Sequence, residues 1–209
     1  AMFGLGVLII LVISAILAPI ISPYDPLQIN IIDKMQGPSL KHPMGTDNYG
    51  RDIFSRVIYG SRYSLYVGFI AVGIGAIFGG IIGGMGGYFG GKLDNIIMRI
   101  MDVLLAIPRV ILAIAIVGVL TNVMVAVGIS ILPRYARVVR GSVLSYREEE
   151  FVEAAKAIGA SDFRIIFETI IPNSMAPIIV QSTLGIAKAI LSAATLSFLG
   201  LGVQPPTPE

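Results

Sequence analysis

The chain alternates between long hydrophobic runs and short polar segments. The first run, residues 2–21, contains no charge and has about the length of a helix that crosses the hydrocarbon core of a bilayer. A second uncharged run covers residues 64–91. Together with three further apolar runs, the pattern predicts one transmembrane domain, residues 1–209, with five spanning helices at residues 2–21, 64–91, 93–120, 122–139 and 174–201.

Two of the predicted helices contain residues that affect their shape. Pro108 lies inside the third run and predicts a kink there, because proline removes a backbone donor and crowds the preceding turn. In the second run, glycine recurs every four residues, at Gly75, Gly79, Gly83, Gly87 and Gly91. Such spacing lets helices approach closely in lipid, so we expect this run to pack against a neighbouring helix.

The segment between the last two runs has the pattern of two short amphipathic helices. The apolar face of the first helix is formed by Phe151, Ala154, Ala155 and Ile158, which recur at helical spacing. Gly159 then predicts the end of this helix, and Ser161 and Asp162 offer side-chain oxygens that cap the next one. A compact pair of polar helices between membrane spans indicates a site where a partner docks.

Composition supports a membrane protein and excludes several other classes. Hydrophobic residues make up 55% of the chain and charged residues 13%, whereas a soluble domain carries about 25% charged residues. A net charge of +2 gives no indication of nucleic-acid binding. The sequence has no Cys, and its single histidine, His42, is interpreted as a solvated loop residue, so no metal site is predicted.

The polar segment also contains a motif with fixed spacing. It resembles the EAA loop of permease subunits of bacterial ABC importers, and the matching residues are Glu153, Ala154, Ala155, Gly159 and Pro172. Thr169 stands where the motif has Ile, and Ile171 where it has Leu, and both changes keep the volume. The resemblance implies that residues 141–172 form a cytoplasmic loop that couples to an ATPase through Glu153, Ala154, Ala155, Gly159, Ala160 and Ser161.

A second motif lies in the polar loop 22–63. It consists of Gly45, Thr46, Asp47, Gly50, Arg51, Asp52, Ser55 and Arg56, and it resembles the segment before the second helix in the dipeptide, oligopeptide and nickel branch of these permeases, particularly the C-type subunit. Residues 199–208 resemble the end of the penultimate helix of that branch. We interpret Arg51, Asp52 and Arg56 as pairing locally and positioning the chain at the headgroups, with direct substrate contact as the alternative.

The resemblance implies an all-α integral membrane fold, the transmembrane domain of a type I ABC importer, with a final helix expected beyond the five spans. It implies a multi-pass, non-catalytic subunit of the bacterial cytoplasmic (inner) membrane, with loop 22–63 outside. The expected partners are a homologous permease in a heterodimer, two ABC ATPases and an extracytoplasmic binding protein. No phosphate-binding Gly-rich loop occurs here, so ATP and Mg are expected on the ATPases and no cofactor in this chain.

The implied cargo is di- or oligopeptides, and two alternatives remain. The first is nickel, carried by a permease of the same branch. The second is an ion-coupled secondary transporter, for which Asp102 is the candidate intramembrane carboxylate. Because Asp102 lies three residues after Arg99, these two side chains are expected to neutralise one another.

Lys188 is the charged residue that the pattern explains least. It stands in the middle of the fifth run, with no acidic residue within a turn or two. An isolated charge in hydrocarbon is costly, so we expect Lys188 either to line a translocation pathway or to pair with a carboxylate of a partner subunit. Ser192, one turn later, is the second pathway candidate; the spacing also permits a Ser–Lys dyad of a membrane enzyme.

Overall fold

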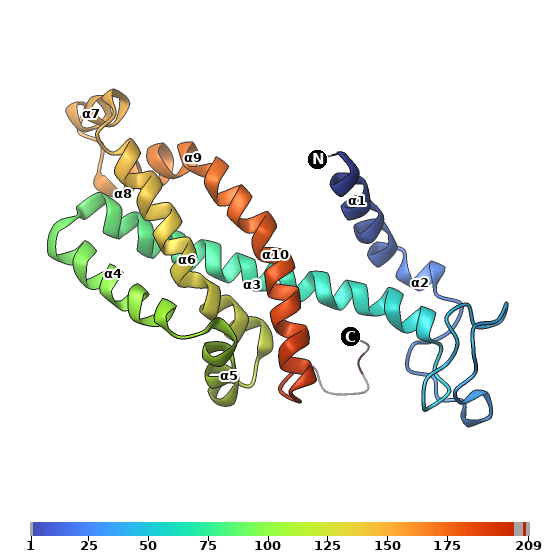
Figure 1. Cartoon of the computed structure of the whole chain (residues 1–209). Helices are drawn as coiled ribbons and strands as arrows, with labels where there is room; N and C mark the ends of the chain where they lie inside the picture. The colour runs from blue at the N-terminus through green and yellow to red at the C-terminus, as the bar shows by residue number, and fades with distance from the viewer. Residues whose placement is uncertain (1, 203–206, 208–209) are drawn as a thin grey trace. The chain divides into compact units, whose positions relative to one another are not determined.

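The structure, a computed structural model, describes residues 2–202 and residue 207. The described residues form helices and loops without a strand (Figure 1). The longer helices are α1 (Met2–Ile16), α3 (Ile53–Phe89), α4 (Gly91–Ala106), α5 (Arg109–Leu120), α6 (Val123–Tyr146), α7 (Glu150–Ala157) and α10 (Met175–Phe198). The short elements are α2 (Ala18–Ile21), the 3-10 helix η1 (Ile31–Asp33), α8 (Asp162–Arg164), the π-helix η2 (Ile165–Ile170) and α9 (Ile171–Asn173).

Where the sequence predicts one domain, the chain divides into two compact units. Unit 1 comprises residues 1–67 and 197–209, and unit 2 comprises residues 68–196. Helix α3 contributes its first part to unit 1 and its longer second part to unit 2. Half of the segment 199–208 that resembles the end of the penultimate helix, residues 203–206 and 208, lies outside the described part of the chain.

The first hydrophobic run of unit 1 is not one straight helix. The sequence predicts a single span over residues 2–21, but α1 ends at Ile16 and α2 begins at Ala18. Pro19 explains the break, because it has no backbone N–H to continue the hydrogen-bond ladder of α1.

By length and apolar composition, two helices within the described residues qualify as membrane spans, α3 and α10. The pair α4–α5 qualifies as a third if it is counted as one span, although the two helices meet at an angle of 98°. Ile107 and Pro108 form this bend, at the position where the sequence predicts a kink. The change of direction is large enough that α4 and α5 are separate helices, and the five-span arrangement remains a prediction.

Unit 2 is held together by close packing of α3 on α6. A Cβ atom added at Gly75 or Gly79 would press on Tyr135 of α6, and one at Gly87 would press on Val143. At Gly83 it would overlap the backbone of Ala136. The stripe of glycines therefore serves helix packing, as the spacing predicts, except that Gly91 lies beyond α3, as the first residue of α4, with a φ of 57°.

Two ion pairs join α4 to α6. Asp94 accepts hydrogen bonds from Arg140, and Asp102 accepts one from Arg137. The sequence predicts that Asp102 pairs with Arg99 on its own helix, and this is wrong. The reason is that α6 lies alongside α4 and brings an arginine within reach of each aspartate, which no single-helix pattern reveals.

The connection between α5 and α6 needs neither Gly nor Pro. Thr121 adopts the left-handed conformation, with a φ of 52°, and its N–H donates to Val117 O over 2.8 Å. The side chain of Asn122 then caps α6 by accepting from the N–H groups of Met124 and Val125. This tight turn returns the chain along α6 towards α7, which lies at the far end of unit 2 (Figure 1).

Candidate functional site

The polar helices form a small knob, residues 150–173, at one end of unit 2 (Figure 1). Helix α7 stops in a Schellman-type turn around Gly159, whose φ is 80°. The N–H of Ala160 donates to Ala155 O over 3.0 Å, and the N–H of Gly159 donates to Lys156 O over 3.0 Å. These bonds satisfy carbonyls that the helix end would leave without a partner, so the turn is well defined.

The second half of the knob begins at Ser161. Its hydroxyl oxygen accepts from the N–H of Arg164 over 3.4 Å and caps α8, as predicted. The predicted capping role of Asp162 is wrong, because its carboxylate accepts a hydrogen bond from the Tyr88 hydroxyl over 2.7 Å. Asp162 therefore joins the knob to the end of α3 instead of closing its own helix.

Pro172 shapes the last part of the knob. It has no N–H, so the regular helical ladder cannot pass through it, and the preceding turn adopts the wider π-helical form of η2. The side-chain amide of Asn173 donates to Thr169 O over 2.7 Å, and the hydroxyl of Ser174 donates to Ile170 O over 2.9 Å. These bonds carry the chain into α10 without leaving the carbonyls unpaired.

The knob is anchored on α6 by an apolar core. Val152 of α7, together with Ile165 and Ile170 of η2, is fully buried against Val139 and Val143 of α6. The sequence pattern did not single out Val152, because it lies off the predicted apolar face. The burial of Val152 can be recognised only once α6 is known to lie beneath the knob.

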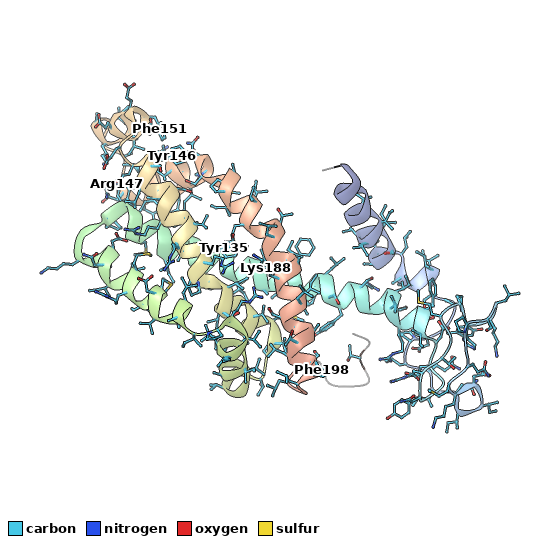
Figure 2. The ribbon with its side chains drawn as sticks, in the orientation of Figure 1. Tyr135, Tyr146, Arg147, Phe151, Lys188 and Phe198 are labelled. Atoms are coloured by element: carbon cyan, nitrogen blue, oxygen red, sulfur yellow. The ribbon has the colours of Figure 1, made fainter. Side chains whose placement is uncertain are left out.

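The predicted apolar face of α7 points largely outward. Phe151 is 39% exposed and Ile158 is 86% exposed, and Phe163 on α8 is 72% exposed. Figure 2 shows Phe151 close to Tyr146 and Arg147 where α6 ends and the knob begins. Glu153, Ala154, Gly159 and Ser161 are also exposed, and Ala155 and Ala160 are half-buried. The exposed apolar side chains around Gly159 form a surface suited to a protein partner.

The end of α3 provides further contacts with the knob. Besides the bond from Tyr88 to Asp162, the ammonium of Lys156 lies 5.5 Å from the centre of the Tyr88 ring. Arg147, just before the knob, donates to Gly87 O over 3.3 Å. A displacement of the knob would therefore be transmitted to α3 as well as to α6, and α10 follows directly in the chain.

The signature loop of unit 1 forms a second constellation, built around Asp47. Its carboxylate accepts from the N–H of Tyr49 and from both the backbone and the guanidinium of Arg51, at 2.7 to 3.0 Å. The guanidinium of Arg56 lies 3.9 Å away. Gly45 and Gly50 have φ values of 76° and 72°, and a Cβ on either would overlap neighbouring backbone. The motif residues therefore specify the fold of the loop.

A buried polar cluster lies beside it. The carboxylate of Asp52 lies 2.9 Å from His42 Nδ1 and accepts two hydrogen bonds from Ser55, one from the hydroxyl and one from the N–H, each 2.7 Å long. His42 is only 4% exposed and packs against the ring of Tyr24, so the prediction of a solvated histidine is wrong. Thr46 is also buried, and its hydroxyl donates to Asp33 O. The expected pairing of Asp52 with the arginines is likewise absent among the described contacts, because Asp47 pairs with both.

The environment of Asp52 makes the loop sensitive to acid. Burial raises the pKa of this carboxyl, but the hydrogen bonds from Ser55 and His42 outweigh burial and hold its pKa below the usual value. A lowered folded-state pKa means that Asp52 stabilises the loop above about pH 4, and that this contribution is lost as the pH falls through the folded-state value.

We expect Asp52→Asn to destabilise the loop by about 2 kcal/mol, because hydrogen bonds to a buried charge contribute more than neutral ones. Limited proteolysis of the purified protein at neutral pH measures this as faster cleavage within residues 22–52. The matched control is Asp25→Asn, an exposed carboxylate in the same loop that, within the described residues, accepts a hydrogen bond only from the N–H of Leu27. Equal cleavage rates in the two variants would contradict the stabilising role of the Asp52 carboxylate.

The two predicted pathway residues on α10 differ in their surroundings. Lys188, which is labelled on α10 in Figure 2, is half-buried and lines a cavity between α6, α10 and the α4–α5 bend. Ser192 is buried, and its hydroxyl donates to Lys188 O over 2.8 Å. This bond to the backbone gives the hydroxyl a structural role within the helix, and the described hydrogen bonds include none between it and the Lys188 ammonium.

Comparison with known proteins identifies the family of this chain. Residues 57–209 match the family described as binding-protein-dependent transport system inner membrane component, and residues 1–38 match the N-terminal transmembrane domain of oligopeptide transport permease C. The chain belongs to this family of inner membrane permeases. It is a C-type permease subunit of the dipeptide and glutathione branch of ABC importers, a non-catalytic component of the bacterial inner membrane.

Curated relatives cover nearly the whole chain. The dipeptide transport system permease protein DppC of Alkalihalophilus pseudofirmus is 49% identical over 100% of this chain and 70% of its own length. The glutathione transport system permease protein GsiD of Escherichia coli O157:H7 is 50% identical over 96% of this chain and 68% of its own. The GsiD protein of Salmonella paratyphi A is 52% identical over 98% of this chain and 69% of its own length. Membership implies ATPase and substrate-binding partners.

Proposed function

We propose that this chain forms half of the translocation pathway for di- and oligopeptides, in a heterodimer with a homologous permease above two ATPases. The observation that carries the proposal is the knob, which presents exposed Ile158 and Phe163 around a fixed turn and buries its other side on α6. A docking element needs both properties, an apolar surface for the partner and a rigid connection to the part that moves. The names of the relatives, which specify dipeptides and glutathione, favour peptides over nickel.

The knob would act as the coupling helix. Closure of the ATPases around ATP displaces α7, and the displacement reaches α6 through Val152 and α3 through the Tyr88–Asp162 bond. Because α6, α7 and the second part of α3 belong to one compact unit, they respond together and alternate the pathway between inward-open and outward-open states. In this orientation loop 22–63, with its signature motif, faces the outside, where the binding protein delivers cargo.

Uptake into liposomes tests the proposal. We expect liposomes that contain this chain with its partner permease and ATPases, and that are supplied with the binding protein, to accumulate radiolabelled dialanine. Accumulation should require ATP on the side of the membrane that carries the ATPases. Radioactive nickel should not accumulate under the same conditions. Nickel uptake without peptide uptake would support the nickel alternative, and accumulation that follows an ion gradient in the absence of ATP would support the secondary transporter.

A further inference from the structure

The charged residues that line the cavity beside Lys188 are all positive. It has a volume of about 140 Å³ and lies in unit 2 between the α4–α5 bend, α6 and α10. Three cationic side chains line it, Arg109, Arg134 and Lys188, and none of the lining residues is acidic. Figure 2 shows Lys188 on α10 near Tyr135 of α6, which also lines the cavity.

The three cations come from three different helices and remain uncompensated. Among the residues that the structure describes, Arg109, Arg134 and Lys188 form no ion pair with a carboxylate. The contrast within α6 is informative, because the next two arginines along the same helix, Arg137 and Arg140, each pair with an aspartate of α4. Arg134 is the arginine of this series that faces the cavity.

Arg109 and Lys188 are half-buried and Arg134 is exposed at the edge of the cavity. Like charges that lie close together repel one another, and charged groups within membrane helices are costly. The arrangement is therefore expected to bind an anion, which removes both costs. The surroundings add to this preference. Helix α5 starts at the cavity directly after Pro108, without a side-chain cap, so the N-terminal end of this helix, with the positive end of its dipole, lies at the cavity. The Gln181 amide is a further hydrogen-bond donor in the lining.

We infer that this cavity is a cargo subsite that binds a carboxylate of the transported peptide; the inference rests on the proposed peptide-importing function. Every unmodified peptide carries a terminal carboxylate, and guanidinium groups bind carboxylates with paired hydrogen bonds. The cavity has room for a small terminal group, and the rest of the peptide extends into the pathway. Lys188 lies halfway along α10 and Arg134 halfway along α6, so in the predicted topology both lie within membrane-spanning runs, residues 174–201 and 122–139.

Ligand-dependent stability of the purified complex, without the binding protein, tests the subsite directly. We expect dialanine to raise the Tm and dialanine amide, which lacks the carboxylate, to raise it less. In Arg134→Gln and Lys188→Met the concentration of dialanine for half of the maximal shift should rise about tenfold or more, because each change removes a charged partner of the carboxylate. The control Arg99→Gln removes one exposed charge from α4, outside the cavity lining. This variant should behave as the unmodified protein.

Uptake in proteoliposomes separates this inference from the proposed function. If the unmodified complex fails to take up peptide with ATP, the proposed function fails. If it transports dialanine and both cavity variants transport it equally well, the subsite alone is wrong. Equal Tm shifts by dialanine and its amide would also overturn the inference. So would loss of the partner permease from Lys188→Met on size exclusion, which would assign Lys188 to a partner carboxylate.

The remaining source of an anion is a lipid headgroup, and lipid composition distinguishes it. Liposomes of phosphatidylcholine alone and liposomes containing phosphatidylglycerol should support the same preference of the complex for dialanine over its amide. If phosphatidylglycerol raises the Tm of the unmodified complex but not of Lys188→Met, and dialanine is not preferred over its amide in either lipid, the cavity binds a headgroup and the cargo subsite is rejected.

Discussion

Gly159→Val is expected to reduce ATP-driven uptake at least tenfold while the subunit still assembles with its partners. Gly159 has a φ of 80°, and a side chain in this left-handed conformation costs about 1 to 2 kcal/mol, more for a β-branched residue. No atom lies within 4 Å of an added Cβ, so the effect comes from the backbone and not from a clash. The turn that presents Ile158 and Phe163 would rearrange, whereas the buried anchor at Val152 would remain.

Two control variants make this result specific. Gly159→Asn should retain most of the uptake, because asparagine tolerates the left-handed region. Gly141→Val places the same side chain on α6, where the helical φ is ordinary and no atom lies within 4 Å of the added Cβ. Uptake and ATPase activity are measured on the reconstituted complex. Unchanged uptake in Gly159→Val would remove the turn from the coupling mechanism.

Gly83→Val is expected to prevent stable packing of α3 on α6. A Cβ at this position would overlap the backbone of Ala136, which cannot rotate away as a flexible side chain would. Overpacking of a close contact costs about 1 to 3 kcal/mol, and the cost is higher when a helix backbone must move. We therefore expect a large loss of folded protein in the detergent extract and a lower Tm in what remains.

The neighbouring glycine supplies the control. Gly80 lies on the same helix three residues earlier, and no atom lies within 4 Å of a Cβ added there. Gly80→Val should therefore retain the yield and Tm of the unmodified protein. Equal losses in the two variants would mean that glycine is needed along α3 for flexibility, and close packing would no longer explain the repeat.

Local pattern was sufficient for the features that depend on one segment. Gly159 was predictable as a helix end, because the residues on both sides have helical spacing and glycine accepts a positive φ. The glycine repeat was predictable as a packing surface for the same reason, since its four-residue period places Gly75, Gly79, Gly83 and Gly87 along one face of α3. Pro108 marked the bend between α4 and α5, although not its size.

Features that join distant segments were not predictable. The burial of Val152 depends on α6, and the partner of Asp102 is Arg137, 35 residues away. His42 is buried because Tyr24 and Asp52 contact it, although it lies in a loop whose composition is polar. The cavity cations were missed for the same reason, because Arg109 and Arg134 meet Lys188 only after α4 and α5 have bent.

The central claim is that the knob contacts an ATPase, and site-specific photo-cross-linking tests it most directly. The chain has no native Cys, so a single Cys at exposed Ile158 can carry a photoreactive benzophenone in the assembled complex. We predict an adduct between this position and an ATPase subunit, and none from the same probe at exposed Asn48 in the signature loop. An ATPase adduct from Asn48 and none from Ile158 would contradict the account, because the knob would then face away from the ATPases.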